Sequence, residues 1–406
     1  MRCAFVAIAL LAAAEAHAFD AGATLDSVWS ATRATLFDTT LVARYFNEED
    51  HLRLREHLRS VPDVSTLADS INRYYEQLHV SHTRMVTADD LEFYLYGSAW
   101  SPFNLDTLQV PHIGIQWARQ GNSYVIRNLL EGYPAQRAGL RRGDIIVSAN
   151  GRPFHPLRSF GDGNVQLLTV RRGLRNVAIQ VQPIRESPMR SLFEAMRSSV
   201  RQIEVGTHRV GYIHLWTCLN PLIQQEFARL VRDSLGTADG IVLDLRDGVG
   251  GGWESFLDPF FPDRSGYAAM TVTSRALGPT FLKPTLVRFP WIDPHPCFSG
   301  PMVVLINEGT RSGKEGIAYQ MKKSKRARLV GVTTAGAFRG GMFHLGRDEG
   351  YILIVAWSHL LLDGEDLEGH GVTPDVEVRF PLESHASGDP QMDRALAEIR
   401  GMLGAP

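Results

Sequence analysis

Ser312 lies where a buried strand should turn into a helix, and such a turn can present a serine hydroxyl for nucleophilic attack. The apolar, β-branched run 302–306 is typical of a buried strand, and the apolar positions of 317–321, followed by Lys322 and Lys323, indicate a helix with a basic end. The first N–H groups of that helix would point at whatever approaches the hydroxyl. Taken alone, however, the segment favours a serine that only caps the helix.

A second glycine-containing turn could complete the chemistry of such a serine. The apolar strand 240–245 is followed by the glycines Gly250 and Gly251. Consecutive glycines let backbone N–H groups approach a ligand closely, as an oxyanion hole requires. We therefore expect the oxyanion donors to be the N–H of Gly313 and that of Gly250 or Gly251.

Neither glycine-rich turn fits a phosphate site. Glu315 stands where a P-loop needs Ser or Thr to bind magnesium, and Trp253 stands at the third glycine of a dinucleotide fingerprint. The sequence has no His-Glu-x-x-His and no paired Cys-x-x-Cys, which gives no support to a metal site. We expect no metal and no cofactor.

The composition bounds the class of protein. The chain has 406 residues, of which 44% are hydrophobic and 21% charged, with a formal net charge of −2. These values are ordinary for a soluble globular protein of two or three domains. Because no long charge run occurs, nothing indicates nucleic acid or an anionic membrane surface as a partner. The oligomeric state is left open.

Residues 1–18 have the pattern of a secretory signal peptide. A positive start, a short apolar run and a small-x-small site predict cleavage after Ala18, and the apolar run is too short to span a bilayer. We therefore expect a secreted, periplasmic protein. Cys3 would be removed, and Cys218 and Cys297 are equally compatible with a disulfide and with two free thiols.

The elements that must position these residues fall into four segments. Residues 19–104 show helical periodicity, whereas residues 105–183 change to short alternating runs separated by glycine. Residues 195–385 alternate strands with helices, and their near-continuous apolar strands are typical of a sheet covered on both faces. Residues 386–406 form a C-terminal helix or tail. The predicted fold class is α/β multidomain.

Residues 134–146 and the turn Asn150-Gly151 resemble a PDZ domain, which implies an inserted β-barrel-like domain over residues 105–183. In PDZ domains a loop of backbone N–H groups captures the terminal carboxylate of a peptide, which adds as an edge strand. The alternative is a PDZ-like domain used only as a spacer or lid. The resemblance predicts a carboxylate-binding loop formed by His112, Ile113, Gly114 and Ile115.

Three further stretches occur together in the second half of the chain. These are Asp244–Arg246 followed by Gly250-Gly251, the block Asn307–Glu315, and the segment Gly331–Gly336. In this order they resemble the carboxyl-terminal-processing (tail-specific) serine peptidases, over nearly the whole chain after residue 18. The resemblance implies an α/β, crotonase-like protease core, serine-type peptidase activity and polypeptide substrates.

The chain departs from the Ser–Lys type of this family. That type carries its base lysine just after a Thr-x-Gly, and the corresponding position here is Ala337. Lys314 lies two residues from Ser312 on a starting helix, so its side chain should point to another face. The sequence therefore argues against a Ser–Lys dyad.

The sequence instead resembles the tricorn-like branch, in which a histidine and a glutamate serve the serine. Residues 78–83 match its Ser-His-Thr/Ala motif, and residues 367–375 match its Glu-x-x-Gly-Val-x-Pro-Asp segment. An imidazole of near-neutral pKa suits a serine, and a partner must then fix its tautomer. The resemblance implies Ser312 as nucleophile, His82 as base, and Ser81 with Glu368 as orienting residues.

Several alternatives stay open. His79 and His370 compete with His82, and His370 is the more serious competitor because it neighbours Glu368. The fold also includes non-catalytic proteins such as the interphotoreceptor retinoid-binding modules. The chain could therefore be a weak or inactive peptide- or hydrophobic-ligand-binding module, or a PDZ scaffold. The intact Ser/His/Glu set favours a secreted serine endopeptidase that cleaves extended or C-terminally presented polypeptides.

Overall fold

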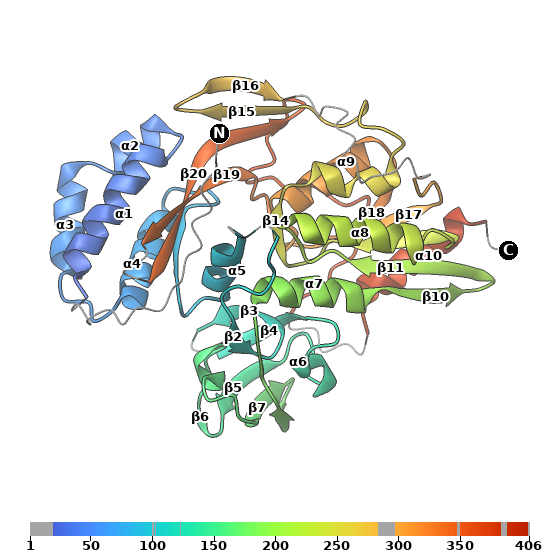
Figure 1. Cartoon of the computed structure of the whole chain (residues 1–406), viewed down its shortest axis with the longest axis horizontal. Helices are drawn as coiled ribbons and strands as arrows, with labels where there is room; N and C mark the ends of the chain where they lie inside the picture. Colours follow the sequence, from blue (N-terminus) through green and yellow to red (C-terminus); the bar gives the residue numbers. More distant parts are fainter. Residues whose placement is uncertain are drawn as a thin grey trace.

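The computed structural model describes most of the chain after the expected signal peptide. Residues 1–18 lie outside the described residues, so the predicted cleavage site has no structural account. Three regions are visible in Figure 1: helices near the N-terminus, a small β-rich domain, and a larger α/β core. The described residues are 19–99, 101, 103–121, 123–282, 297–346, 350–382 and 388–404.

The N-terminal region consists of four helices that pack on a long strand from the far end of the chain. Each helix begins after an Asp or Asn whose side chain accepts a hydrogen bond from the first turn. Their apolar faces share one core with residues of β20 (Tyr351–Leu362). The helices are α1 (Ala21–Thr35), α2 (Thr39–Tyr45), α3 (Glu48–Leu58) and α4 (Val64–Glu76).

The region predicted as helical also contains a strand. β1 (Arg84–Thr87) pairs antiparallel with the first half of β20, and α5 (Leu91–Ala99) packs on the opposite face of that pair. The second half of β20 pairs with β15 (Met270–Ser274), which pairs in turn with β16 (Gly278–Leu282). β19 (Arg339–Gly346) lies along the other edge of β20. This sheet joins the N-terminal helices to the core.

The expected PDZ domain is a sheet with strand order β3-β4-β5-β7-β8, in which β3 is an edge strand. Its apolar side chains form a separate core around Ile126, Leu168 and Val170. Outside this sheet, β2 (Val110–His112) pairs with β9 (Ile184–Glu186) where the chain enters and leaves the domain. The elements are β3 (Ile115–Gln120), β4 (Ser123–Leu129), α6 (Pro134–Arg137), β5 (Ile145–Ala149), β6 (Arg152–Pro153), η1 (Arg158–Phe160), β7 (Gln166–Arg172) and β8 (Arg175–Val181).

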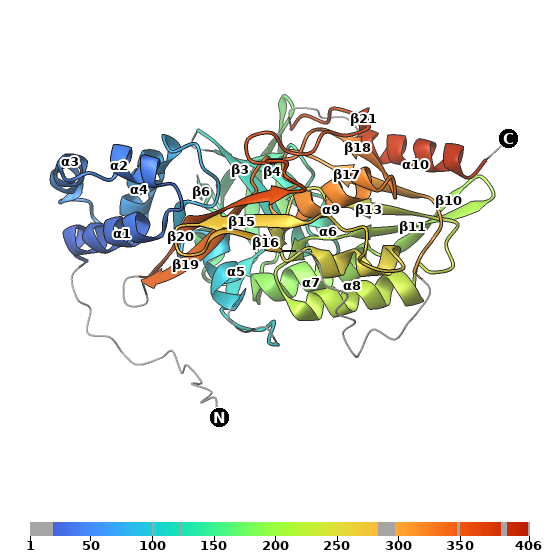
Figure 2. The same cartoon turned by 90° about the horizontal axis from the view of Figure 1, so that it is seen from above.

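The α/β core is a sheet with strand order β10-β11-β13-β17-β18-β21, parallel except for β10. Successive side chains alternate between its faces, so Ile241 and Leu243 pack toward α7, α8 and α9, whereas Val242 packs toward α10. Figure 2 shows these helix layers on the two sides of the sheet. The strands are β10 (Arg201–Val205), β11 (His208–His214), β13 (Gly240–Asp244), β17 (Met302–Ile306), β18 (Arg328–Gly331) and β21 (Val376–Glu377), and the helices are α7 (Pro188–Ser199), α8 (Pro221–Asp233), α9 (Gly313–Lys323) and α10 (Pro390–Met402).

A short ladder beside the sheet carries the glycine run. β14 (Val249–Gly251) pairs in parallel with β12 (Thr217–Cys218), and two short 3-10 helices follow, η2 (Glu254–Phe256) and η3 (Asp258–Phe260). Cys218 is buried here as a free thiol, and Cys297 is also free. Within the described residues, no helix combines the length and the apolar character needed to cross a membrane.

Candidate active site

Ser312 occupies the turn between β17 and α9 with its hydroxyl directed at a histidine. Its Oγ lies 3.2 Å from Nε2 of His82. Its φ of 56° is in the left-handed region, which a non-glycine residue rarely adopts without a local reason. The contact with Nε2 therefore places the hydroxyl next to the imidazole.

His82 reaches Ser312 from a different part of the fold. It lies in the turn between α4 and β1, also with a positive φ, of 57°. The next residue, Thr83, accepts a hydrogen bond at Oγ1 from the backbone N–H of Ala356 in β20, at 3.1 Å. This bond and the β1–β20 pairing hold the histidine turn against the sheet.

Ser81 and Glu368 complete a chain of hydrogen bonds behind the imidazole. Ser81 Oγ lies 2.8 Å from His82 Nδ1 and 2.8 Å from Oε2 of Glu368. A carboxylate only accepts, so the Ser81 hydroxyl donates to Glu368 and must accept from Nδ1–H. This assignment leaves Nε2 unprotonated and facing the Ser312 hydroxyl, which is the tautomer that a general base requires.

The Glu368 carboxylate is itself fixed by backbone donors. Its Oε1 accepts from the N–H of Ser81 at 2.6 Å, and its Oε2 accepts from the N–H of Phe338 at 2.7 Å. Asp366 accepts from the N–H of Glu368 at 3.0 Å. The competing histidine His370 is exposed, and its Nδ1 lies 2.9 Å from the backbone oxygen of Glu368. Among the described residues, neither His370 nor His79 forms a hydrogen bond with Ser312.

Glu315 is a site residue whose role the sequence analysis missed. Its buried carboxylate accepts from the N–H of Ser312 at 3.0 Å, from Oγ1 of Thr334 at 2.7 Å, and from the N–H groups of Gly336 and Ala337 at 2.7 and 2.9 Å. It therefore ties the nucleophile to the segment that follows β18. The signal was available, because Ser-x-x-Glu at a helix start is a capping-box pattern.

The expected oxyanion glycines pack directly against the nucleophile. A Cβ added to Gly250 would lie 2.5 Å from Ser312 Cβ and 2.7 Å from the nitrogen of Gly313, and one added to Gly313 would lie 1.9 Å from the oxygen of Gly251. No side chain fits at those distances, so glycine is required. As the first residue of α9, Gly313 has no intrahelical acceptor for its N–H.

Lys314 is turned away from the nucleophile, as expected from its place on the helix. Its side chain is fully buried and Nζ donates to the backbone oxygen of Asp247. Burial lowers the pKa of this amine to about 8. The lysine braces the turn after β13, while the histidine occupies the position of a base next to Ser312.

The surroundings of His82 favour its neutral form. Burial, followed by the positive charges of Arg311 and Arg339, lowers its pKa from 6.5 to about 3. A histidine with such a pKa is unprotonated throughout the neutral range, so Nε2 is free to accept a proton.

The predicted carboxylate-binding loop is partly closed by its own histidine. The N–H of Gly114 donates to Nδ1 of His112 at 3.1 Å, and Nε2 of His112 lies 3.0 Å from Oγ of Ser191. Ile113 is buried in the core of the domain, and Ile115 begins the edge strand β3. Burial lowers the pKa of His112 to about 4, so the ring is neutral.

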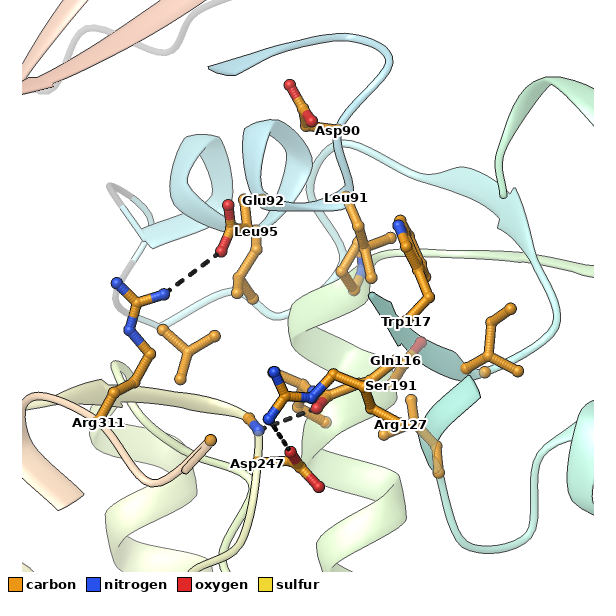
Figure 3. A pocket seen from close by; sticks show the side chains of 18 of the residues that line it. Asp90, Leu91, Glu92, Leu95, Gln116, Trp117, Arg127, Ser191, Asp247 and Arg311 are labelled. Atoms are coloured by element: carbon orange, nitrogen blue, oxygen red, sulfur yellow. Dashed lines mark hydrogen bonds and ion pairs between the residues drawn. The ribbon is translucent and has the colours of Figure 1, made fainter. Parts of the chain in front are cut away.

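One cavity extends from this loop to residues that neighbour Ser312. It has a volume of about 460 Å³, and its lining includes His112, Gly114 and Ile115 at one end and Arg311 and Ala337 beside Ser312 at the other. Figure 3 shows the part of the cavity between α5, β3 and the turn after β13.

Three side chains of the expected PDZ domain contact the turn after β13. Arg127 contacts the carboxylate of Asp247 at 3.1 Å (Figure 3). Asn128 contacts the same carboxylate at 3.0 Å, and Oε1 of Gln116 accepts from the N–H of Gly248 at 2.9 Å. The same turn leads into the glycines of β14. The domain is thus attached to the strand that carries the expected oxyanion donors. Such contacts between distant segments leave no local sequence signal.

The predicted residues thus converge from separate segments of the chain. The structure brings together Ser312, His82, Ser81, Glu368 and the glycines, and the cavity lined by the PDZ loop also reaches Arg311 and Ala337 beside Ser312. Within the described residues, no group of three or more His, Cys, Asp or Glu side chains is arranged to hold a metal ion. The arrangement can activate an alcohol and stabilise an oxyanion, which is the chemistry of acyl transfer.

Two segments match known families. Residues 209–378 match peptidase family S41, and residues 125–162 match the PDZ domain. These matches and the fold confirm the family and the fold class predicted from the sequence.

Individual relatives are distant but cover much of the chain. The chloroplastic C-terminal processing peptidase of Tetradesmus obliquus is 25% identical over 84% of this chain and 75% of its own length. The carboxy-terminal processing protease CtpA of Bacillus subtilis is 25% identical over 66% of this chain and 56% of its own length. Among solved structures, the photosystem II D1 C-terminal processing protease superimposes with a TM-score of 0.54 at 19% identity, covering 95% of this chain and 98% of that protein.

Proposed function

Because the chain belongs to peptidase family S41 and contains a PDZ domain, we propose that its serine peptidase activity is performed by Ser312 with His82 as the general base. The observation that supports this assignment best is the 3.2 Å contact between Ser312 Oγ and His82 Nε2, made by residues that are 230 positions apart. The same two residues were expected from the sequence.

The proposed reaction has two acyl-transfer steps. Ser312 Oγ attacks the peptide carbonyl while its proton passes to Nε2 of His82, and the carbonyl oxygen becomes an oxyanion. The imidazolium then protonates the leaving amine, which departs as the new N-terminus and leaves an acyl ester on Ser312. In the second step His82 removes a proton from water, which attacks the ester and releases the new C-terminus.

The remaining site residues hold the charges that develop. The N–H of Gly313, with that of Gly250 or Gly251, stabilises the oxyanion. Ser81 and Glu368 support the imidazolium through the hydrogen bond to Nδ1. Because the resting pKa of His82 is low, the imidazolium returns its proton readily to the leaving amine.

The proposed substrates are extended polypeptides, and the PDZ domain presents their C-termini. The relatives named above are C-terminal processing proteases, and here the predicted carboxylate-binding loop lines the same cavity as Arg311 and Ala337, which neighbour Ser312. The edge strand β3 offers free backbone groups to which a peptide can pair. The enzyme is proposed to act in the periplasm after removal of residues 1–18.

A fluorophosphonate probe tests the catalytic assignment. The purified protein should be labelled at one serine, and mass spectrometry should locate the label on Ser312. Ser312→Ala should abolish labelling, and His82→Ala should slow it by at least a hundredfold while circular dichroism remains unchanged. Labelling that proceeds normally in His82→Ala would overturn the assignment, and a folded protein that is never labelled would favour a non-catalytic binding module.

The proposed location is tested separately. After expression of the full chain in a Gram-negative host, fractionation should place the protein in the periplasm, and N-terminal sequencing should begin at Phe19. Recovery of the unprocessed chain from the cytoplasm would contradict this part of the proposal without affecting the active site.

A further inference from the structure

Three charged side chains of the cavity lining lie close to one another. Arg311 immediately precedes Ser312, Arg84 lies two residues after His82, and Glu92 comes from the first turn of α5. All three line the cavity, and Figure 3 shows Arg311 and Glu92 extending toward each other across it.

The Glu92 carboxylate is hydrogen-bonded to only one of the two arginines. Glu92 Oε2 lies 2.6 Å from Nη1 of Arg84, whereas Glu92 Oε1 lies 3.9 Å from Nη1 of Arg311. The first distance is that of a charge-assisted hydrogen bond, and the second is too long for a hydrogen bond. Asp90 also lines the cavity and acts electrostatically on Arg84, so both of these carboxylates favour Arg84.

Arg311 is left with no carboxylate at hydrogen-bond distance among the described residues. Its guanidinium has five N–H donors, and the described part of the chain provides no hydrogen-bond acceptor for any of them. Its side chain is 29% exposed, so it is open to the cavity without being surrounded by bulk water. In this partly desolvated position a guanidinium attracts a carboxylate more strongly than at the surface, and the two groups can pair through two parallel hydrogen bonds.

We propose that Arg311 is a specificity-determining residue that binds an acidic side chain of the substrate close to the scissile bond. This inference rests on the proposed function. The competing explanation is structural: Arg311 could act only as a brace between the nucleophile loop and α5 through Glu92. The distances argue against it, since Glu92 bonds to Arg84 and leaves Arg311 at 3.9 Å.

The test measures binding first, so that it does not depend on turnover. In the Ser312→Ala background, dissociation constants are measured by fluorescence anisotropy for one labelled decapeptide in which a single Glu is moved along a neutral sequence. Each Glu peptide is paired with its Gln counterpart. At one position, or at two neighbouring positions, Glu should bind about tenfold or more tightly than Gln, the effect of one charge-assisted hydrogen bond.

Variants then assign the preference. Adding Arg311→Gln should reduce the ratio of the affinities for the Glu and Gln peptides to about one. Arg311→Lys keeps the positive charge and should retain part of that ratio, so it controls for misfolding of the Gln variant. Glu92→Gln should maintain or increase the ratio, because it removes the competing carboxylate. Arg119→Gln is the matched control, since Arg119 lines the same cavity from the PDZ strand β3 and should leave the ratio unchanged.

Several results would overturn the inference. These are a flat Glu scan, an unchanged ratio in Arg311→Gln, an equal loss in Arg119→Gln, and a preference that disappears when the peptide C-terminus is amidated. The last result would assign Arg311 to the terminal carboxylate and not to a side chain. Cleavage by the wild type distinguishes the two proposals, because turnover of Glu and Gln peptides at equal rates refutes only the role of Arg311, whereas absence of any turnover refutes the proposed function.

Discussion

Replacement of Ser81 by alanine should slow acylation of Ser312 without preventing substrate binding. The Ser81 hydroxyl is the acceptor for Nδ1–H of His82 and the link to Glu368, at 2.8 Å on each side. The substitution removes that link alone, because the backbone N–H of residue 81 and that of Phe338 still hold the carboxylate. The Glu368 side chain should therefore stay in place.

The size of the effect follows from the charge on the imidazole in the transition state. His82 gains a proton there, so the lost hydrogen bond is one to a charged donor, worth about 1.5–3 kcal/mol. This corresponds to a loss of about 10- to 150-fold in the acylation rate constant. KM should change little, because Ser81 does not line the cavity that leads to Ser312.

The measurement is the second-order rate constant for fluorophosphonate inactivation, together with kcat and KM on a cleaved peptide. Ser65→Ala is the matched control, since Ser65 Oγ is also hydrogen-bonded, to Thr87 at 3.1 Å, but takes no part in the contacts around His82. It should keep the wild-type rate constant. If Ser81→Ala reacts as fast as this control, the hydrogen-bond chain is not used in catalysis and the reasoning is refuted.

Three further predictions concern the oxyanion strand, its attachment and the base. Gly250→Ala should abolish labelling by the fluorophosphonate, because the new Cβ would lie 2.5 Å from that of Ser312. Gly252→Ala is the control and should label normally, because the space around its Cβ is open. Equal labelling of both variants would contradict the packing argument. Gln116→Ala should lower the rate constant of labelling by about 3- to 10-fold, because one neutral hydrogen bond is lost. Gln116→Glu keeps an acceptor and should retain most of the wild-type rate constant. An unchanged rate constant in Gln116→Ala would show that this contact of the PDZ domain does not affect catalysis. Because the pKa of His82 is lowered to about 3, kcat/KM should stay near its value at pH 7 down to about pH 5. With a histidine of pKa 6.5 as the base, kcat/KM would already be about thirtyfold lower at pH 5. A fall in kcat/KM centred near pH 6.5 would refute the environment assigned to His82.

The sequence was sufficient for the segments whose chemistry is local. The apolar run 302–306 became β17 with the same bounds, and the residues expected at the site, Ser312, His82 and Glu368, lie together. Their catalytic roles stay a prediction. These positions could be found because motif, turn chemistry and hydrophobic pattern all indicate the same arrangement.

Contacts between distant segments were not accessible in this way. β1 was read as part of a helical region, because four residues have too little periodicity to reveal pairing with a strand more than 260 positions later. Glu315 was considered only as the residue that excludes a P-loop, although it holds both Ser312 and the segment 334–337. The hydrogen bond between Gln116 and Gly248 joins two domains, and the sequence around neither residue predicts it.

The position of β1 has a consequence for how the protein can be regulated or monitored. His82 belongs to the N-terminal region and Ser312 to the α/β core, and the two side chains meet while β1 is paired with β20. The reactivity of Ser312 toward the probe therefore depends on the β1–β20 pairing as well as on the catalytic groups. In a denaturant titration, loss of probe reactivity should mark the point at which β1 separates from β20.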